Sequence, residues 1–141
     1  MIKVPTYAQL MNPTLHALRA LGGSATIEEI YSRVTELVGL TNEQLEVLHD
    51  PERGGQTEVE YRLAWSRTYL KKYGILENSS RGIWALTAKG RQLEQVDVST
   101  VKRYVDGDQL LTKLKELSLG VQTKKVEIEQ VVLDASWFAT I

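Results

Sequence analysis

The segment from residue 57 to residue 90 constrains the fold of this 141-residue chain most, because it combines a long helix with a hairpin. Thr57 and Glu60 form a capping box, in which a hydroxyl and a carboxylate satisfy free amides at a helix start. Gly74 is suited to end the helix, since glycine readily adopts the left-handed conformation of a C-terminal cap. Two short apolar runs follow, at residues 75–76 and 83–86. Residues 78–82 lie between them and are of types that form turns. The segment predicts a helix that leads directly into a two-stranded hairpin with Arg81 at its tip.

The basic side chains of the protein are concentrated in the same segment. The formal net charge of the chain is −1, yet residues 53–91 contain eight basic and three acidic side chains, and residues 1–52 contain three and seven. A local basic surface on a near-neutral protein is what contact with phosphates requires. Charge alone leaves a second interpretation open, namely a solvated face with scattered Lys and Arg. A basic helix followed by a hairpin is, however, typical of the DNA-contacting half of a winged helix, so we expect double-stranded DNA as the partner.

Helical geometry divides the basic helix into two faces, because successive residues lie about 100° apart. The residues predicted to pack inward are Val59, Leu63, Ser66, Leu70 and Tyr73. A small residue on the opposite face, Ala64, would let the helix approach base edges closely. The predicted DNA-binding residues are Ala64, Arg67, Thr68, Lys71 and Lys72 on the helix and Ser79, Ser80 and Arg81 on the hairpin. We expect Trp65 and Trp84 to pack against the protein, with base stacking as the alternative for Trp65.

Three more capping boxes precede the basic helix and mark further helix starts. They pair Thr6 with Gln9, Thr26 with Glu29 and Thr41 with Gln44. Pro13 predicts a kink or a fresh helix start at residues 12–13. The helix after Thr26 has apolar residues at three- and four-residue spacing, which predicts a core-facing side with Ile27, Ile30, Tyr31, Val34, Leu37 and Val38. Together with a short helix capped by Thr87, these elements predict an α+β winged helix-turn-helix domain over residues 1–96.

Residues 97–141 show a different pattern. Val101, Tyr104 and Val105 precede Asp106-Gly107, and a leucine-rich stretch then runs to Gly120. Residues 121–133 alternate between apolar and polar side chains, as in a half-covered strand. We therefore expect a strand-helix-strand appendage over residues 97–141 that packs on the first domain or on a second copy. Trp137-Phe138 favours a homodimer contact, and packing within the chain is the alternative.

Composition argues against several other classes of protein. The chain has no cysteine, no run of eighteen apolar residues and no basic-then-apolar leader, so we expect a cytoplasmic protein without disulfides or a membrane span. His16 and His49 lack a third ligand at metal spacing, and no nucleophile-base pair or phosphate-cradling glycine loop is present. The sequence therefore predicts no metal, no cofactor and no catalytic residue.

The order and spacing of several short motifs resemble the N-terminal domain of the Mrr family of restriction endonucleases. The matching motifs are Val4-Pro5-Thr6-Tyr7, Gly39-Leu40-Thr41, the run from Arg62 to Gly74, Ser80 to Trp84, and Leu86-Thr87. Together they cover roughly residues 3–95. This resemblance implies a DNA-binding winged helix, which in that family lies ahead of a separate nuclease domain that acts on modified DNA.

The tail resembles the last part of the Mrr catalytic domain, through residues 104–111, 119–121 and 134–138. The family's nuclease centre needs an acidic residue and an acid-or-Gln-x-Lys step that hold a divalent metal. Gln122-Thr123-Lys124 with Asp108 upstream is the nearest candidate, and we interpret it as a chance match. We therefore expect a DNA-binding relative of Mrr without its own nuclease centre. Two alternatives stay open: a restriction endonuclease, or a subunit of one, acting on modified DNA, and a protein-interaction or dimerisation module.

Overall fold

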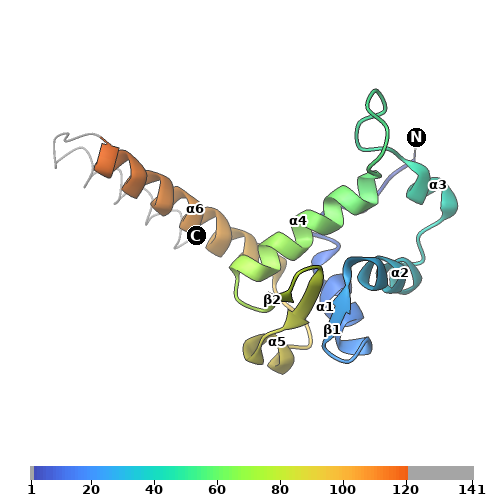
Figure 1. Ribbon diagram of the computed structural model, residues 1–141, viewed down its shortest axis with the longest axis horizontal. Helices are drawn as coiled ribbons and strands as arrows, with labels where there is room; N and C mark the ends of the chain where they lie inside the picture. Colours follow the sequence, from blue (N-terminus) through green and yellow to red (C-terminus); the bar gives the residue numbers. More distant parts are fainter. Residues whose placement is uncertain (1, 121–141) are drawn as a thin grey trace. The chain divides into compact units, whose positions relative to one another are not determined.

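The computed structural model describes residues 2–120 (Figure 1). The chain divides into two compact units, residues 1–98 and residues 99–141, and each is described by itself. The described elements in chain order are α1 (Met11–Ala20), β1 (Ser24–Thr26), α2 (Ile27–Val38), α3 (Asn42–Glu46), α4 (Glu58–Lys72), β2 (Leu76–Ser80), β3 (Ile83–Leu86), α5 (Ala88–Gln92) and α6 (Val98–Gly120). The protein is therefore a mixed α+β structure with six helices and a small antiparallel sheet among the described residues.

All four predicted capping boxes are confirmed. In each, the threonine Oγ1 accepts from the backbone N–H three residues on, and the side-chain Oε1 of that Glu or Gln accepts from the threonine N–H. The first box, at Thr6, closes a turn over residues 7–10 rather than a full helix. Helix α1 then begins at Met11 with Pro13 in its first turn, where a missing N–H costs little. The expected fresh start near residues 12–13 is thus confirmed to within one residue.

Helices α1, α2 and α4 enclose the core of residues 1–98, and α1 contacts both of the others. Large side chains of this core that are less than 2% exposed include Leu15 and Leu18 of α1, Ile30 and Val34 of α2, and Leu63 and Leu70 of α4. The prediction that all six apolar residues of α2 face the core is wrong for three of them. Ile27, Leu37 and Val38 are 40%, 52% and 37% exposed, because only the middle of the helix is covered.

The sheet has the strand order β1-β3-β2, with both pairs antiparallel. The hairpin is confirmed, with Arg81 and Gly82 forming its tip, and Gly82 has the positive φ of 76° that such a tight turn requires. The predicted turn was too long, because residues 78–80 continue strand β2 through a bulge. Strand β1 was missed altogether. Its three residues pair with residues 83–85, so that β3 is hydrogen-bonded on both sides.

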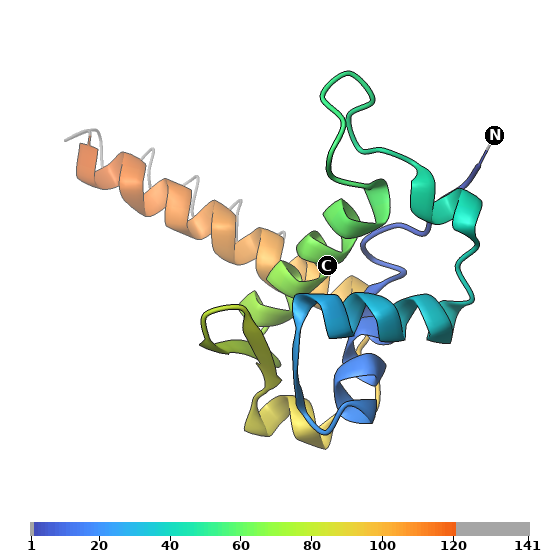
Figure 2. The same ribbon diagram turned by 45° about the vertical axis from the view of Figure 1, so that its right-hand side comes forward.

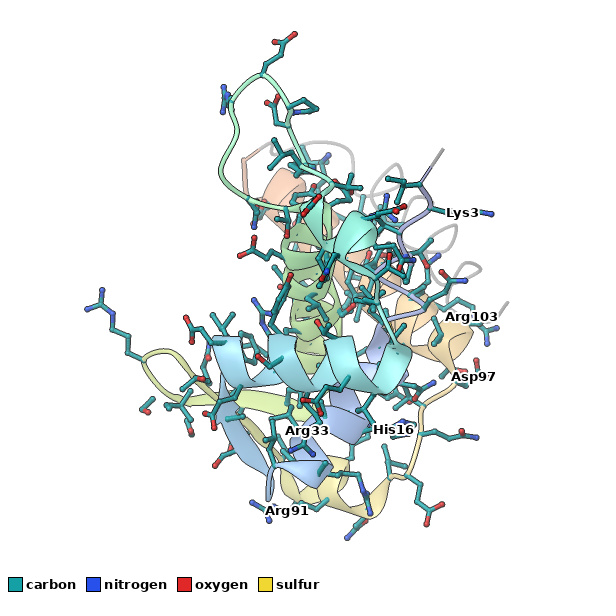
Figure 3. The ribbon with its side chains drawn as sticks, turned by 90° about the vertical axis from the view of Figure 1, so that its right-hand side faces the viewer. Lys3, His16, Arg33, Arg91, Asp97 and Arg103 are labelled. Atoms are coloured by element: carbon teal, nitrogen blue, oxygen red, sulfur yellow. The ribbon has the colours of Figure 1, made fainter. Side chains whose placement is uncertain are left out.

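The segment after α5 is anchored to α1 by side chains of that helix. Asn12 and Val96 exchange two hydrogen bonds, from Asn12 Nδ2 to the Val96 carbonyl at 3.1 Å and from the Val96 N–H to Asn12 Oδ1 at 2.8 Å. Arg19 donates to the Leu93 carbonyl at 2.6 Å, and His16 Nε2 lies 2.9 Å from the Glu94 carbonyl oxygen (Figure 3). These bonds hold the end of the first unit against its first helix.

Helix α6 corrects the prediction for residues 97–141. One helix runs without interruption from Val98 to Gly120, so the first strand of the expected strand-helix-strand appendage is absent. Val98, Val101 and Val105 recur at helical spacing, and an interior glycine costs a helix only about 1 kcal/mol, so Asp106-Gly107 does not end it. The predicted strand at residues 121–133, the Gln122–Lys124 motif and Trp137-Phe138 lie outside the described residues. No helix of the described part has the length and apolar character needed to cross a membrane.

Gly90 permits α5 to lie directly against the backbone before the hairpin. A Cβ atom at this position would lie 2.2 Å from the carbonyl oxygen of Ile75. We expect Gly90→Ala to lower the free energy of unfolding by about 1–3 kcal/mol through overpacking, as measured by urea denaturation. Gly107→Ala is the matched control, because no atom lies within 4 Å of its Cβ position and alanine favours a helix. Equal urea midpoints for Gly90→Ala and the wild type would contradict the close approach.

Candidate nucleic-acid interface

Helix α4 has the two faces expected from its sequence. Val59, Leu63, Ser66 and Leu70 are at most 1% exposed, which confirms the inward face, whereas Tyr73 is only half-buried. The buried Ser66 hydroxyl is satisfied, because it donates to backbone carbonyls, that of Tyr7 among them. The inward face of α4 is therefore packed in the core, and its opposite face can contact a partner molecule.

The other predicted site residues of α4 occupy that opposite side. Lys71 and Lys72 are exposed in the last turn, and Ala64 and Thr68 are half-buried. The Thr68 hydroxyl donates to the Ala64 carbonyl at 2.9 Å, so its proton is already used within the helix. The hairpin leaves the C-terminal end of this helix (Figure 2), and its residues Ser79, Ser80 and Arg81 are all exposed.

Arg67 differs from the expectation. The sequence indicated a side chain at the border of the outward face, free to reach DNA, but Arg67 is only 7% exposed. Its guanidinium lies over the ring of Trp84, with Cζ 5.5 Å from the ring centre, and its Nε has no hydrogen-bond partner among the described residues. Burial lowers the pKa of this guanidinium. Trp84, which covers the Arg67 guanidinium, belongs to strand β3. A helical projection of α4 contains only residues of that helix, so it could not reveal this contact.

Trp84 also contacts a second cation of α4. Lys71 Nζ lies 5.9 Å from the ring centre, within the range of a cation–π interaction. Trp84 itself is 9% exposed, which confirms its predicted place in the core. Trp84 of the hairpin thus contacts two side chains in the last turns of α4. This contact places Lys71 next to strand β3, which follows Arg81 in the chain.

The eight basic side chains of residues 53–91 do not form one outward surface. Arg62 is half-buried and donates to the Val4 carbonyl at 2.7 Å, the Pro5 carbonyl at 3.1 Å and Glu58 at 2.8 Å. Lys89 Nζ lies over the Tyr73 ring at 4.0 Å. Three more basic residues also lie away from the predicted surface. Arg67 is buried, and Arg53 lies 3.8 Å from Asp50. The guanidinium of Arg91, a residue of α5, lies close to Gly23. The exposed cations of helix and hairpin are therefore Lys71, Lys72 and Arg81.

An aromatic row along α4 was not recognised in the sequence. The rings of His49 and Tyr61 stack with centres 3.5 Å apart, and Trp65 contacts Tyr61 and Tyr69 edge-on at 6.4 and 6.3 Å. Tyr7 continues the row at 5.0 Å from Tyr69. Trp65 is 42% exposed and contacts rings of its own helix, so the expectation of packing against the protein is only partly met. The four-residue spacing of 61, 65 and 69 is the signal that predicts such a row.

A groove of about 340 Å³ lies between α2 and α4, and we call it the α2–α4 groove. The residues that line it are Ile27, Glu28, Tyr31, Ser32, Gln56, Glu60, Leu63, Ala64 and Arg67. Ala64 and Arg67 are predicted site residues, so the groove opens beside the outward face of α4. The described residues hold no group of three or more His, Cys, Asp or Glu side chains placed to bind a metal ion.

Comparison with known proteins gives a consistent result for this part of the chain. The family model of the Mrr N-terminal domain matches residues 7–95. The chain is also similar to the type IV methyl-directed restriction enzyme EcoKMrr of Escherichia coli K12, with 29% identity over 87 residues. That alignment covers 62% of this chain but only 28% of the enzyme. No solved structure matched the chain significantly.

Glu58 links the start of α4 to the loop before it. Its two carboxylate oxygens bond Arg62 Nε at 2.8 Å and His49 Nδ1 at 2.9 Å. Desolvation by burial acts to raise the pKa of Glu58, but hydrogen bonds and charges from His49 and Arg62 outweigh it, so the pKa lies below its ordinary value of 4.5. A carboxylate whose pKa is lower in the folded state contributes its full stabilisation when the pH is above its pKa in the unfolded state. This contribution is lost as the pH falls through its pKa in the folded state.

We expect Glu58→Gln to lower the free energy of unfolding by roughly 1 kcal/mol at neutral pH. The difference from the wild type should shrink as the pH falls below 4.5, where Glu58 itself becomes protonated. Urea denaturation near pH 7 and near pH 3 measures both values. Glu36→Gln is the control, because Glu36 is 76% exposed and 3.8 Å from Arg33, so little change is expected at either pH. A Glu58→Gln difference that is as large near pH 3 would show that the ion pairs are not its cause.

Arg67→Met removes a buried charge and keeps an unbranched apolar side chain. We expect the free energy of unfolding to rise by about 1 kcal/mol, because desolvation of an unpaired guanidinium costs more than its contact with Trp84 supplies. Arg62→Met is the matched variant on the same helix. It removes a guanidinium with three hydrogen bonds and should lower stability by about 2 kcal/mol. Urea denaturation of the two variants tests the contrast, and loss of stability in Arg67→Met would refute it.

Proposed function

Because this chain belongs to the Mrr N-terminal domain family, we propose that it binds double-stranded DNA through a winged helix, as part of a restriction system. The order α1-β1-α2-α3-α4-β2-β3 supports this proposal, with α3 as a short insertion before the recognition helix. In this arrangement α4 lies in the major groove, and the β2–β3 hairpin is the wing that reaches the adjacent backbone or groove. The family model ends at residue 95, so the proposal concerns the part of the chain before residues 97–141.

The observation that carries the proposal is the set of exposed cations at the junction of α4 and the hairpin. Within the described part of the chain, Lys71, Lys72 and Arg81 form no ion pair with a carboxylate. Two lie in the last turn of α4 and one at the hairpin tip, so they flank the outward face that carries Ala64 and Thr68. Cations without a carboxylate partner, beside a helix face on which Ala64 and Thr68 are small, favour contact with the phosphates on both sides of a groove.

The proposed function of this chain is DNA binding and includes no catalytic step. The name of the E. coli relative describes methyl-directed restriction, but this chain matches only 28% of that enzyme. The exposed aromatic row of α4 favours a second candidate function, a contact surface for another protein. The two functions differ in their response to salt, since phosphate contacts release counterions and apolar contacts do not.

We expect Lys71→Ala, Lys72→Ala and Arg81→Ala each to weaken binding of a labelled duplex. For every phosphate contact that is lost, the slope of log affinity against log salt should become shallower by about 0.9. Fluorescence anisotropy at several salt concentrations measures both quantities, and a methylated duplex measured in parallel shows whether modification matters. Arg33→Ala is the control, because it removes the same charge from an exposed pair on α2. Salt-independent binding, or an equal loss in Arg33→Ala, would count against the proposal and favour the protein-contact alternative.

A further inference from the structure

The α2–α4 groove combines a cavity with a buried polar group that has no partner. Arg67 is more than nine-tenths buried, lines the groove and leaves its Nε without a hydrogen bond among the described residues. An unsatisfied buried group usually has a structural or functional reason, because its desolvation is not compensated. A guanidinium group among the residues that line a groove suits a ligand that accepts hydrogen bonds.

The other lining residues limit what that ligand can be. Glu28 and Glu60 lie in the same groove, so a phosphate group would meet two negative charges beside the one positive charge. Glu60 Oε1 accepts from the Thr57 N–H at 3.0 Å and from its hydroxyl at 2.9 Å, which leaves Oε2 as a free acceptor among the described residues. The groove therefore suits a neutral ligand that offers adjacent acceptors to Arg67 and donors to Glu60.

The apolar part of the groove adds a requirement of shape. Ile27, Leu63 and Tyr31 contribute apolar and aromatic side chains to the lining, and such side chains pack well against a planar aromatic ligand. The volume of about 340 Å³ lies at the lower end of the range of about 300–1,000 Å³ found for small-molecule sites. Guanine is a planar base with the needed pattern, since O6 and N7 are adjacent acceptors that match the guanidinium fork.

We propose that the α2–α4 groove receives a guanine base swung out of the DNA stack, with Arg67 donating to O6 and N7 and Glu60 accepting from the Watson–Crick edge. This proposal rests on the DNA binding proposed above and names a base that is read. Ala64 connects the two, because it belongs both to the outward face of α4 and to the groove lining. A base extruded next to α4 therefore has a short path into the groove, at the cost of unstacking.

The test uses duplexes in which one base has already lost its partner. The full-length protein is titrated with a matched duplex and with duplexes that carry guanine, 7-deazaguanine or adenine opposite an abasic site. We expect the unpaired guanine to bind about tenfold more tightly than the matched duplex, because extrusion costs less, and more tightly than the other two unpaired bases. 7-Deazaguanine lacks the N7 acceptor, so it isolates the contribution of Arg67.

Two groove variants separate base reading from folding. Arg67→Met should abolish the preference for guanine over 7-deazaguanine. Glu60→Gln should reduce the preference for guanine over adenine, and its fold should persist because Gln9 and Gln44 complete capping boxes elsewhere in this chain. Arg33→Ala, which lies outside the groove lining, should keep every preference.

The outcomes distinguish the two proposals. Salt-dependent binding of every duplex without a preference for unpaired guanine overturns the base-reading proposal and leaves DNA binding intact. Absence of binding to all duplexes overturns both. A guanine preference that survives in Arg67→Met and Glu60→Gln also overturns the groove as the reading site, because neither proposed partner is then needed.

Discussion

The position of Trp84 between the hairpin and α4 is the contact on which the candidate interface depends. Its strand, β3, is hydrogen-bonded to β1 on one side and to β2 on the other, so the indole ring is fixed by backbone on both sides. Arg67 and Lys71 lie over that ring at 5.5 and 5.9 Å. The same residue therefore buries one cation and directs another, and it holds the helix that bears Lys71 to the hairpin that bears Arg81.

The burial of Arg67 divides the basic residues of α4 into two kinds. Lys71 and Lys72 keep their hydration and suit reversible contact with phosphates, whose attraction depends on salt. Arg67 is largely desolvated and forms no ion pair with a carboxylate among the described residues, which is costly and is tolerated mainly where a site requires it. In the proposed DNA complex, long-range attraction to a duplex and discrimination of a base would fall to different side chains of one helix.

Features encoded by short stretches of sequence could be predicted, and those that need a distant partner could not. The capping boxes depend on residues three apart, and the hairpin depends on Gly82 between two apolar runs, so both were found. Strand β1 has three residues and exists through pairing with β3, which no local pattern reveals. The burial of Arg67 depends in the same way on Trp84. Arg62 is likewise held away from the predicted surface by hydrogen bonds to the carbonyls of residues 4 and 5. In α6, Asp106-Gly107 resembles a turn in the sequence, but the helix continues through it, in keeping with the helical spacing of the valines before it.

The central place of β3 has a consequence for how the first unit assembles. The β2–β3 hairpin closes across two residues, so its loop entropy is small and it can form early. Pairing of β1 with β3 must wait until the intervening chain, with α2, α3 and α4, has folded back, and such non-local pairing slows folding. The β2–β3 hairpin and the completed sheet therefore require loop closures of very different length. A change in β1 would delay the longer closure while leaving the shorter one at its own rate.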